Sequence, residues 1–212
     1  SDALQNMIDA TACLEHLKSG VVVLFGQAEE TASLIYDPRY CRKDSFDMVY
    51  LSVNMHTVGS ISNRVLYKND DYLKHDPHDF SGLDIKDQKL QDVDPKCITW
   101  IKVHPGISEN SFKDLGNKIV ILEGYASFTM PQNIADILNE SNLLVVFVVT
   151  DGSKEMPSAK YPSLKKLENR VLLSCSLPET VYVNTTCAAA LIDEEDKLVE
   201  YLSRKIESSI SF

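Results

Sequence analysis

Short apolar runs rich in β-branched residues recur along the chain and predict its strands. They cover residues 21–25, 48–53, 98–103, 119–122, 143–149, 171–173 and 181–183. The runs at 21–25, 119–122 and 143–149 are continuous rather than alternating. A continuous run is typical of a strand that is covered on both faces, as in a parallel sheet between two layers of helices.

Helical patterns lie between several of these runs, at residues 27–35, 108–115 and 131–138, and Pro131 suits a first helical turn. Strands that alternate with helices predict an α/β fold with right-handed crossovers. We therefore expect residues 1–212 to form a single three-layer αβα domain with a mostly parallel sheet of about five to seven strands. The runs 171–173 and 181–183 are too close for a crossover helix, so they predict an antiparallel edge near the C-terminus.

Two further segments stand apart from this pattern. Residues 193–210 predict an amphipathic C-terminal helix, with acidic residues at its start and leucine or isoleucine at every fourth position from Leu198. Residues 68–96 form a polar insertion with eight aspartates, five lysines and few aliphatic residues. We expect much of this insertion to be mobile unless a partner or a metal orders it. Its few aliphatic side chains cannot supply enough hydrophobic burial to offset the conformational entropy that ordering the backbone costs.

The net charge and the cysteine content argue against some functions and indicate a cellular compartment. The formal net charge of −10 argues against a broad nucleic-acid-binding surface, which needs clustered lysine and arginine. No apolar run reaches the length of about 18 to 20 residues that a membrane span needs, and the first residues lack a signal-peptide pattern. The five cysteines are odd in number and irregularly spaced, which favours reduced thiols in the cytoplasm or nucleus.

The turn after the first predicted strand stands where a phosphate-binding loop would lie. It reads Gly26-Gln-Ala-Glu-Glu-Thr31, with one glycine, no lysine and two carboxylates that would repel phosphate. The layout therefore has a Rossmann-like or RecA-like outline with a degenerate nucleotide site. We expect no nucleotide and no other cofactor there.

Polar residues at the ends of the predicted strands are candidate ligand or catalytic groups: Asn54, His104, Glu123 and Asp151. Ligands of doubly wound folds bind beyond the carboxyl ends of the strands. Glu123 would be the base or metal ligand, Asp151 its charge partner and His104 a proton carrier. The alternative is that these residues only terminate buried strands. The sequence contains no G-x-S-x-G, C-x-x-C or H-E-x-x-H motif.

Three other features are candidate binding groups. His75 and His78, with flanking aspartates, could hold zinc or form part of a solvated loop. Trp100 could anchor a partner or face the second helical layer. A basic segment within 154–170 could meet an acidic protein surface or a nucleic-acid backbone, or be a solvated loop; its candidate residues are Lys160, Lys165, Lys166 and Arg170.

These observations support two hypotheses of different classes. The leading one is a non-catalytic, protein-binding subunit of an intracellular complex, because the layout resembles a nucleotide-binding fold without the phosphate chemistry. The alternative is an enzyme, or a binder of a small ligand or metal, that uses the polar residues at the strand ends.

Overall fold

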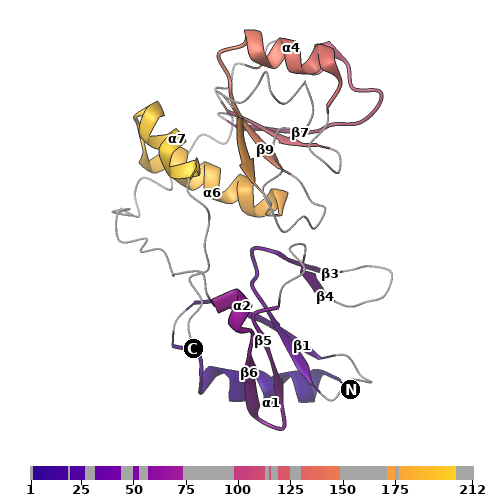
Figure 1. The fold of residues 1–212 in the computed structure, drawn as a ribbon, viewed down its shortest axis with the longest axis vertical. Helices are drawn as coiled ribbons and strands as arrows, with labels where there is room; N and C mark the ends of the chain where they lie inside the picture. Colours follow the sequence, from indigo (N-terminus) through magenta and orange to yellow (C-terminus); the bar gives the residue numbers. More distant parts are fainter. Residues whose placement is uncertain are drawn as a thin grey trace. The chain divides into compact units, whose positions relative to one another are not determined.

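The structure is a computed structural model. It describes residues 2–18, 20–26, 32–43, 50–52, 57–73, 98–112, 115, 119–124, 130–148, 171–174 and 177–203. The chain divides into two compact units (Figure 1). The first unit contains the described residues up to Leu73, and the second contains those from Ile98 to Ser203.

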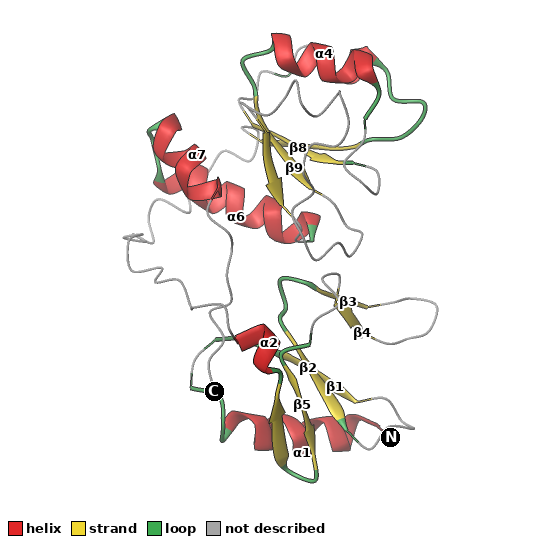
Figure 2. Cartoon of the chain, viewed as in Figure 1, coloured by secondary structure: helices red, strands yellow, loops and turns green. Residues whose placement is uncertain are grey.

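The first unit combines a helix with antiparallel strands (Figure 2). Its four-stranded sheet has the order β1-β2-β5-β6, and every neighbouring pair is antiparallel. Strands β3 and β4 form a separate antiparallel pair. The elements of this unit are α1 (Asp2–Leu14), β1 (Val23–Gly26), β2 (Ser33–Tyr36), β3 (Cys41–Lys43), β4 (Tyr50–Ser52), β5 (Gly59–Ser62), β6 (Val65–Lys68) and α2 (Asp70–Leu73).

Helix α1 packs on the four-stranded sheet through both apolar and polar contacts. Buried side chains of α1 and the strands form the core, which contains Ala12, Cys13, Ile35, Val58 and Ile61. The Gly26 N–H donates to Asn6 Oδ1 over 2.8 Å, and Ser33 Oγ donates to Asp9 Oδ2 over 2.6 Å. A Cβ atom on Gly26 would lie 2.6 Å from Ser33 Oγ, so a larger residue here would displace the Ser33 hydroxyl that bonds Asp9.

The turn between β5 and β6 is a two-residue hairpin loop. Asn63 and Arg64 both have positive φ angles, 50° and 65°. Two consecutive residues with positive φ are the mark of a type I′ turn, whose twist matches that of antiparallel strands. Asn63 adopts this conformation readily, whereas Arg64 occupies a position where glycine is preferred.

The second unit is built on a four-stranded parallel sheet with the order β10-β9-β8-β7. Helices lie on both sides of this sheet (Figure 2). The elements are β7 (Ile98–Lys102), the 3₁₀ helix η3 (Glu109–Phe112), β8 (Ile119–Glu123), α4 (Gln132–Glu140), β9 (Leu144–Val148), β10 (Val171–Ser174), α6 (Pro178–Leu191) and α7 (Glu195–Ser203).

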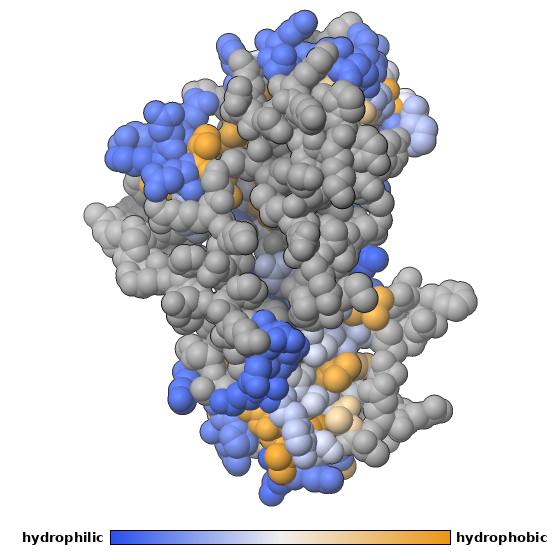
Figure 3. Space-filling model, in the orientation of Figure 1, coloured by the Kyte–Doolittle hydropathy of each residue, from blue (hydrophilic) through white to orange (hydrophobic). Residues whose placement is uncertain are grey.

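Strand β8 separates two apolar cores because its side chains alternate between the two faces of the sheet. Val120 and Leu122 pack toward α4 and η3. Ile119 and Ile121 pack toward α6 and α7. Every residue of β8 and β9 is buried, as the continuous apolar runs predict. The outer surfaces over α4 and α7 are mostly hydrophilic (Figure 3).

The predicted fold class, a single three-layer domain with a mostly parallel sheet of five to seven strands, is wrong. The parallel sheet has four strands and is confined to the second unit, whereas the first unit is antiparallel. The apolar run 21–25 predicts a parallel strand that is covered on both faces, yet β1 pairs antiparallel with β2 and is an edge strand of the sheet that the structure describes. Strand β2 occupies the end of the segment 27–35 that predicts a helix.

The predicted antiparallel edge near the C-terminus is also wrong. Strand β10 pairs in parallel with β9, and residues 181–183 lie inside helix α6. Pro178 begins this helix, where its fixed φ and missing N–H are tolerated. Val181 and Ala188 then share the buried face of α6, so packing against the sheet outweighs the strand preference of the β-branched residues.

The two outlying segments are described only in part. Of the polar insertion 68–96, the structure describes the last residue of β6, Asn69 and helix α2; residues 74–96 lie outside the described residues, so their mobility stays a prediction. Helix α7 lies within the predicted helix 193–210, and its residue Leu198 is buried. Among the described residues, no helix has the length and apolar character to cross a bilayer.

Candidate functional site

Lys102 and Glu123 form an ion pair at the carboxyl edge of the parallel sheet. They are the last residues of β7 and β8 and lie directly opposite one another in the strand register. Lys102 Nζ donates to Glu123 Oε1 over 2.7 Å. Glu123 is only 7% exposed, whereas the Lys102 side chain is 74% exposed. The pair therefore joins a buried carboxylate to a cation that solvent or a ligand can reach.

The alternation of side chains along the strands accounts for this pairing. Ile98, Trp100 and Lys102 are at every second position of β7, so they share one face of the sheet. Glu123 shares that face through the same period along β8, two residues after Ile121, which packs toward α6 and α7. Because the two strands are parallel and in register, their last residues meet at one edge.

His104 lies two residues beyond Lys102, in the turn that follows β7. The Val103 N–H donates to the Glu123 carbonyl over 2.8 Å and extends the pairing past the end of β7. The Gly106 N–H donates to His104 Nδ1 over 3.2 Å. With Nδ1 as the acceptor, a neutral His104 carries its N–H on Nε2, and its ring is exposed.

Gly124 lets the chain leave β8 close to β9. A Cβ atom on Gly124 would lie 2.3 Å from Phe147 Cζ, so any larger residue would displace the buried Phe147 ring. The Gly124 N–H donates to the Val148 carbonyl over 3.1 Å. This glycine keeps the backbone after Glu123 against the sheet.

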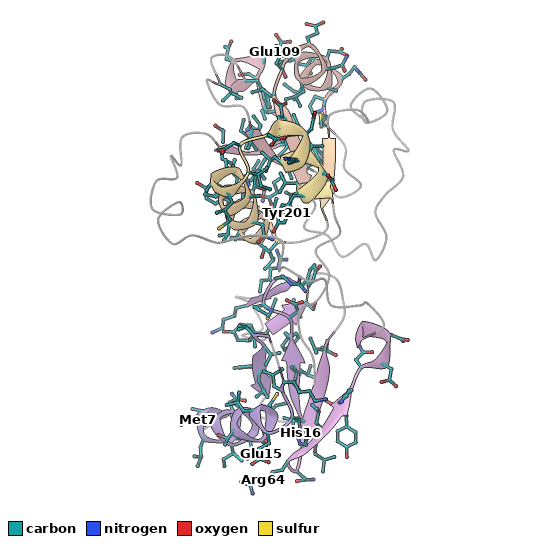
Figure 4. The ribbon with its side chains drawn as sticks, turned by 90° about the vertical axis from the view of Figure 1, so that its left-hand side faces the viewer. Met7, Glu15, His16, Arg64, Glu109 and Tyr201 are labelled. Atoms are coloured by element: carbon teal, nitrogen blue, oxygen red, sulfur yellow. The ribbon has the colours of Figure 1, made fainter. Side chains whose placement is uncertain are left out.

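Helix α4 follows β8 in the chain and packs on the other face of the sheet, against Val120 and Leu122. Gln132 and Asn133 begin this helix. Asn133 Nδ2 donates to Glu109 Oε1 over 3.3 Å, and Glu109 lies beside α4 (Figure 4). The described contact at the start of α4 is therefore with η3 and not with the Lys102–Glu123 pair.

The structure tests the placement of only some of the sequence-predicted site residues. It brings Glu123 and His104 to one edge of the sheet and adds Lys102, which no sequence pattern distinguishes. Trp100 is 39% exposed, with its ring 6.3 Å from the Tyr182 ring of α6, and its role as an anchor stays a prediction. The other candidates lie outside the described residues: Asn54, Asp151, His75, His78, Lys160, Lys165, Lys166 and Arg170.

The described residues offer little for a metal ion. Within the described ranges, no cluster of three or more histidine, cysteine, aspartate or glutamate side chains is arranged to hold one. The polar side chains that the structure describes at this edge are the Lys102–Glu123 ion pair and the exposed His104.

Comparisons with known proteins identify the fold. No family model and no curated protein sequence matches the chain. Among solved structures, the chain is similar to the probable cytoplasmic L-asparaginase from Campylobacter jejuni, with a TM-score of 0.63 and 18% sequence identity. The alignment covers 95% of this chain and 61% of the asparaginase chain.

This likeness corrects the leading functional hypothesis. The expected framework, a Rossmann-like nucleotide-binding fold that has lost its phosphate site, is not the one the chain has. The hypothesis of a non-catalytic, protein-binding complex subunit built on that framework is overturned by the match to an enzyme. The fold of the chain is that of an L-asparaginase structure, of which it spans 61% of the length.

Proposed function

We propose that this chain is an asparaginase-like enzyme, or the corresponding part of one, and that it binds a small amino-acid amide beside Lys102 and Glu123. The observation that carries the proposal is the buried Glu123 carboxylate held by Lys102 at the carboxyl edge of the sheet, in a fold that matches an L-asparaginase over 95% of the chain. This is the alternative hypothesis from the sequence, with Lys102 added to its residues.

The chemistry of the edge fits such a ligand. An amino-acid amide such as L-asparagine presents a carboxylate, an ammonium and a neutral amide. The exposed Lys102 ammonium has three N–H donors, of which one bonds Glu123, so others can bind the ligand carboxylate. Glu123 can accept from the ligand ammonium. His104, which lies two residues beyond Lys102 in the chain, is the candidate to exchange a proton as water cleaves the amide to a carboxylate and ammonia.

The first test measures ammonia release from L-asparagine, together with the melting temperature in the presence of L-asparagine or L-aspartate. We expect Glu123→Gln to lower kcat/KM at least about tenfold, because loss of one charge-assisted hydrogen bond costs roughly 1.4 kcal/mol or more. The Glu123→Gln change keeps the side-chain shape and a hydrogen bond with Lys102, so the variant should melt near the wild-type temperature.

Glu194→Gln is the matched control. Glu194 pairs with Lys197 over 2.6 Å at an exposed site of the same unit, so the same chemical change is made away from the sheet edge. We expect this control to have wild-type activity. Absence of both ammonia release and ligand stabilisation in the wild-type chain would contradict the proposal.

We also assign the protein to the cytoplasm. Among the described residues, Cys13, Cys41 and Cys187 are free thiols. Burial raises the pKa of Cys13, and burial, with a further contribution from the Asp37 carboxylate, raises the pKa of Cys41 to about 11. Both shifts disfavour the thiolate, which is the reactive form of cysteine.

A further inference from the structure

The residues just after β7 keep the alternation of that strand. The Val103 N–H donates to the Glu123 carbonyl over 2.8 Å, so the parallel pairing continues one residue past Lys102. Val103 is buried in the core on the α4 side of the sheet, against which Ile101 also packs. Side chains of extended backbone alternate between the two faces of a sheet. The alternation therefore places His104 on the same side as Lys102, which is the side of α6 and α7 (Figure 2).

The turn that follows orients the His104 ring. Residues 104–107 read His-Pro-Gly-Ile, and the Ile107 N–H donates to the His104 carbonyl over 2.9 Å, which is the hydrogen bond of a β-turn. Proline and glycine suit the two central positions of such a turn. The Gly106 N–H donates to His104 Nδ1 over 3.2 Å. Both ends of the turn are anchored, because Val103 and Ile107 are buried in one core.

Charged side chains close to this turn in the chain or in the sheet are bonded to other groups. Lys102 and Glu123 bond one another, and Glu109 of η3 accepts from Asn133. Within the described residues, the Gly106 N–H is the hydrogen-bond partner of the imidazole. Since Nδ1 accepts that bond, a neutral imidazole has its N–H on Nε2 and offers a ligand a donor but no acceptor.

We propose that His104 donates a hydrogen bond from Nε2 to the carbonyl oxygen of the substrate amide. This inference rests on the proposed function and narrows the role of His104 there from proton exchange to hydrogen-bond donation. The proposed function assigns the carboxylate and the ammonium of an amino-acid amide to Lys102 and Glu123, which leaves the amide group. Its carbonyl oxygen is an acceptor, so it matches the kind of group that a neutral His104 offers.

Such a donor acts on the transition state more than on the bound substrate. As water adds to the amide carbon, the π electrons of the C=O bond move to the oxygen, and a donor aimed at that oxygen stabilises the developing negative charge. A neutral imidazole can polarise a carbonyl in this way. The overall change, from amide and water to carboxylate and ammonium, takes no proton from His104, so its N–H bond stays intact.

Two variants of His104 separate a donor from a proton carrier and from a turn-forming residue. In His104→Gln the side-chain amide can place an N–H donor near the position of Nε2. In His104→Asn the shorter side chain can accept from the Gly106 N–H, as in an Asx turn, but extends no further. We expect His104→Asn to lower kcat for ammonia release from L-asparagine on the order of 100-fold with little change in KM. His104→Gln should keep kcat within about tenfold of wild type.

The position of the ring proton can be measured without any activity. Nitrogen-15 NMR of the histidine side chains in the wild-type chain, at alkaline pH where imidazole is neutral, distinguishes an N–H on Nε2 from one on Nδ1. The signals that disappear in His104→Asn are those of His104. We expect its N–H on Nε2, and an N–H on Nδ1 would overturn the proposal.

The order of the two variants decides between the possible roles of His104. Large losses of similar size in both would show that His104 exchanges a proton, and a larger loss in His104→Gln would show that it only holds the turn. Wild-type activity in both would show that it has no role. Each of these results overturns the donor role and leaves the proposed function standing. A wild-type chain that releases no ammonia contradicts the proposed function itself, and the donor role with it.

Discussion

Among the described residues, the buried polar side chains other than Thr185 form hydrogen bonds with other side chains. Asp9 and Ser33 bond one another at the α1–sheet contact. Asp37 accepts from Arg39, with Oδ2 2.6 Å from Arg39 Nη2, and Glu123 accepts from Lys102. Thr185 of α6 differs: it is fully buried, and its Oγ1 has no hydrogen-bond partner within the described structure. A buried hydroxyl without a partner loses its hydration and gains nothing in return.

We expect Thr185→Val to stabilise the protein by about 1 kcal/mol, because valine keeps the side-chain shape and removes the unpaired hydroxyl. For a chain of this size the gain corresponds to a rise of roughly 2 to 4 °C in melting temperature. Thr186→Val is the control, since Thr186 Oγ1 donates to the Tyr182 carbonyl over 2.7 Å and the change removes a bond that is made. If Thr185→Val lowered the melting temperature as much as Thr186→Val, the hydroxyl would have a partner after all.

At the scale of elements, the hydrophobic pattern predicts buried strands and amphipathic helices better than edge strands. Strands β8 and β9 lie where the continuous apolar runs predict them, and helix α4 lies where the helical pattern at 131–138 predicts it. The sequence does not predict the β1–β2 hairpin, because an apolar run shows neither whether a strand pairs in parallel or antiparallel nor how many strands lie beside it. Helix α6 is missed because a short β-branched stretch at residues 181–183 does not reveal that packing makes it helical.

Some residues of the candidate site could likewise be predicted from the sequence, and one could not. Glu123 and His104 could be found from sequence, because a polar residue that ends a buried strand lies at the ligand-binding edge of a parallel sheet. Lys102 could not, since a lysine at the end of a strand is ordinary until the register shows which residue it faces. The only available signal was its position, two residues after Trp100 and two before His104.

The type I′ turn between β5 and β6 yields a prediction at this scale. We expect Arg64→Gly to stabilise the first unit by about 0.5 to 1 kcal/mol, because glycine avoids the left-handed strain at φ 65° while losing somewhat more backbone entropy. Arg42→Gly, in strand β3, is the control and should destabilise by a similar amount, since glycine weakens a strand interior. Urea denaturation of both variants measures the two free energies of unfolding. A loss of stability in Arg64→Gly would show that the arginine side chain contributes more than the turn conformation costs.

At the scale of the whole molecule, the direction of the strands decides what the fold can bind. The parallel sheet of the second unit has a carboxyl edge where polar residues converge, and the first unit has none because its strands alternate in direction. The continuous run at 21–25 belongs to the unit without such an edge. A continuous apolar run therefore predicts β8 and β9 correctly, but it wrongly predicts that β1 is a strand of a parallel sheet.

The antiparallel pairing of β1 with β2 leads to a prediction about nucleotide binding. A phosphate-binding loop needs a strand, a loop of free backbone N–H groups and the start of a helix. Only residues 27–31 separate Gly26 from the described residues that lead into β2. The next described strand, β2, pairs antiparallel with β1 rather than in parallel as in a phosphate-binding βαβ unit, and the Gly26 N–H already bonds Asn6. We therefore expect Mg²⁺ with ATP or GTP to leave the melting temperature unchanged at millimolar concentration.

L-Asparagine or L-aspartate should instead raise the melting temperature in the same thermal-shift experiment. A ligand present at about 100 times its dissociation constant stabilises the folded state by about 2.7 kcal/mol, which such an experiment resolves easily. The Glu123→Gln variant should lose the shift with the amino acids and show none with nucleotides. A nucleotide-dependent rise that survives Glu123→Gln but disappears in Asn6→Ala would locate a phosphate site at the β1–β2 turn and refute this prediction.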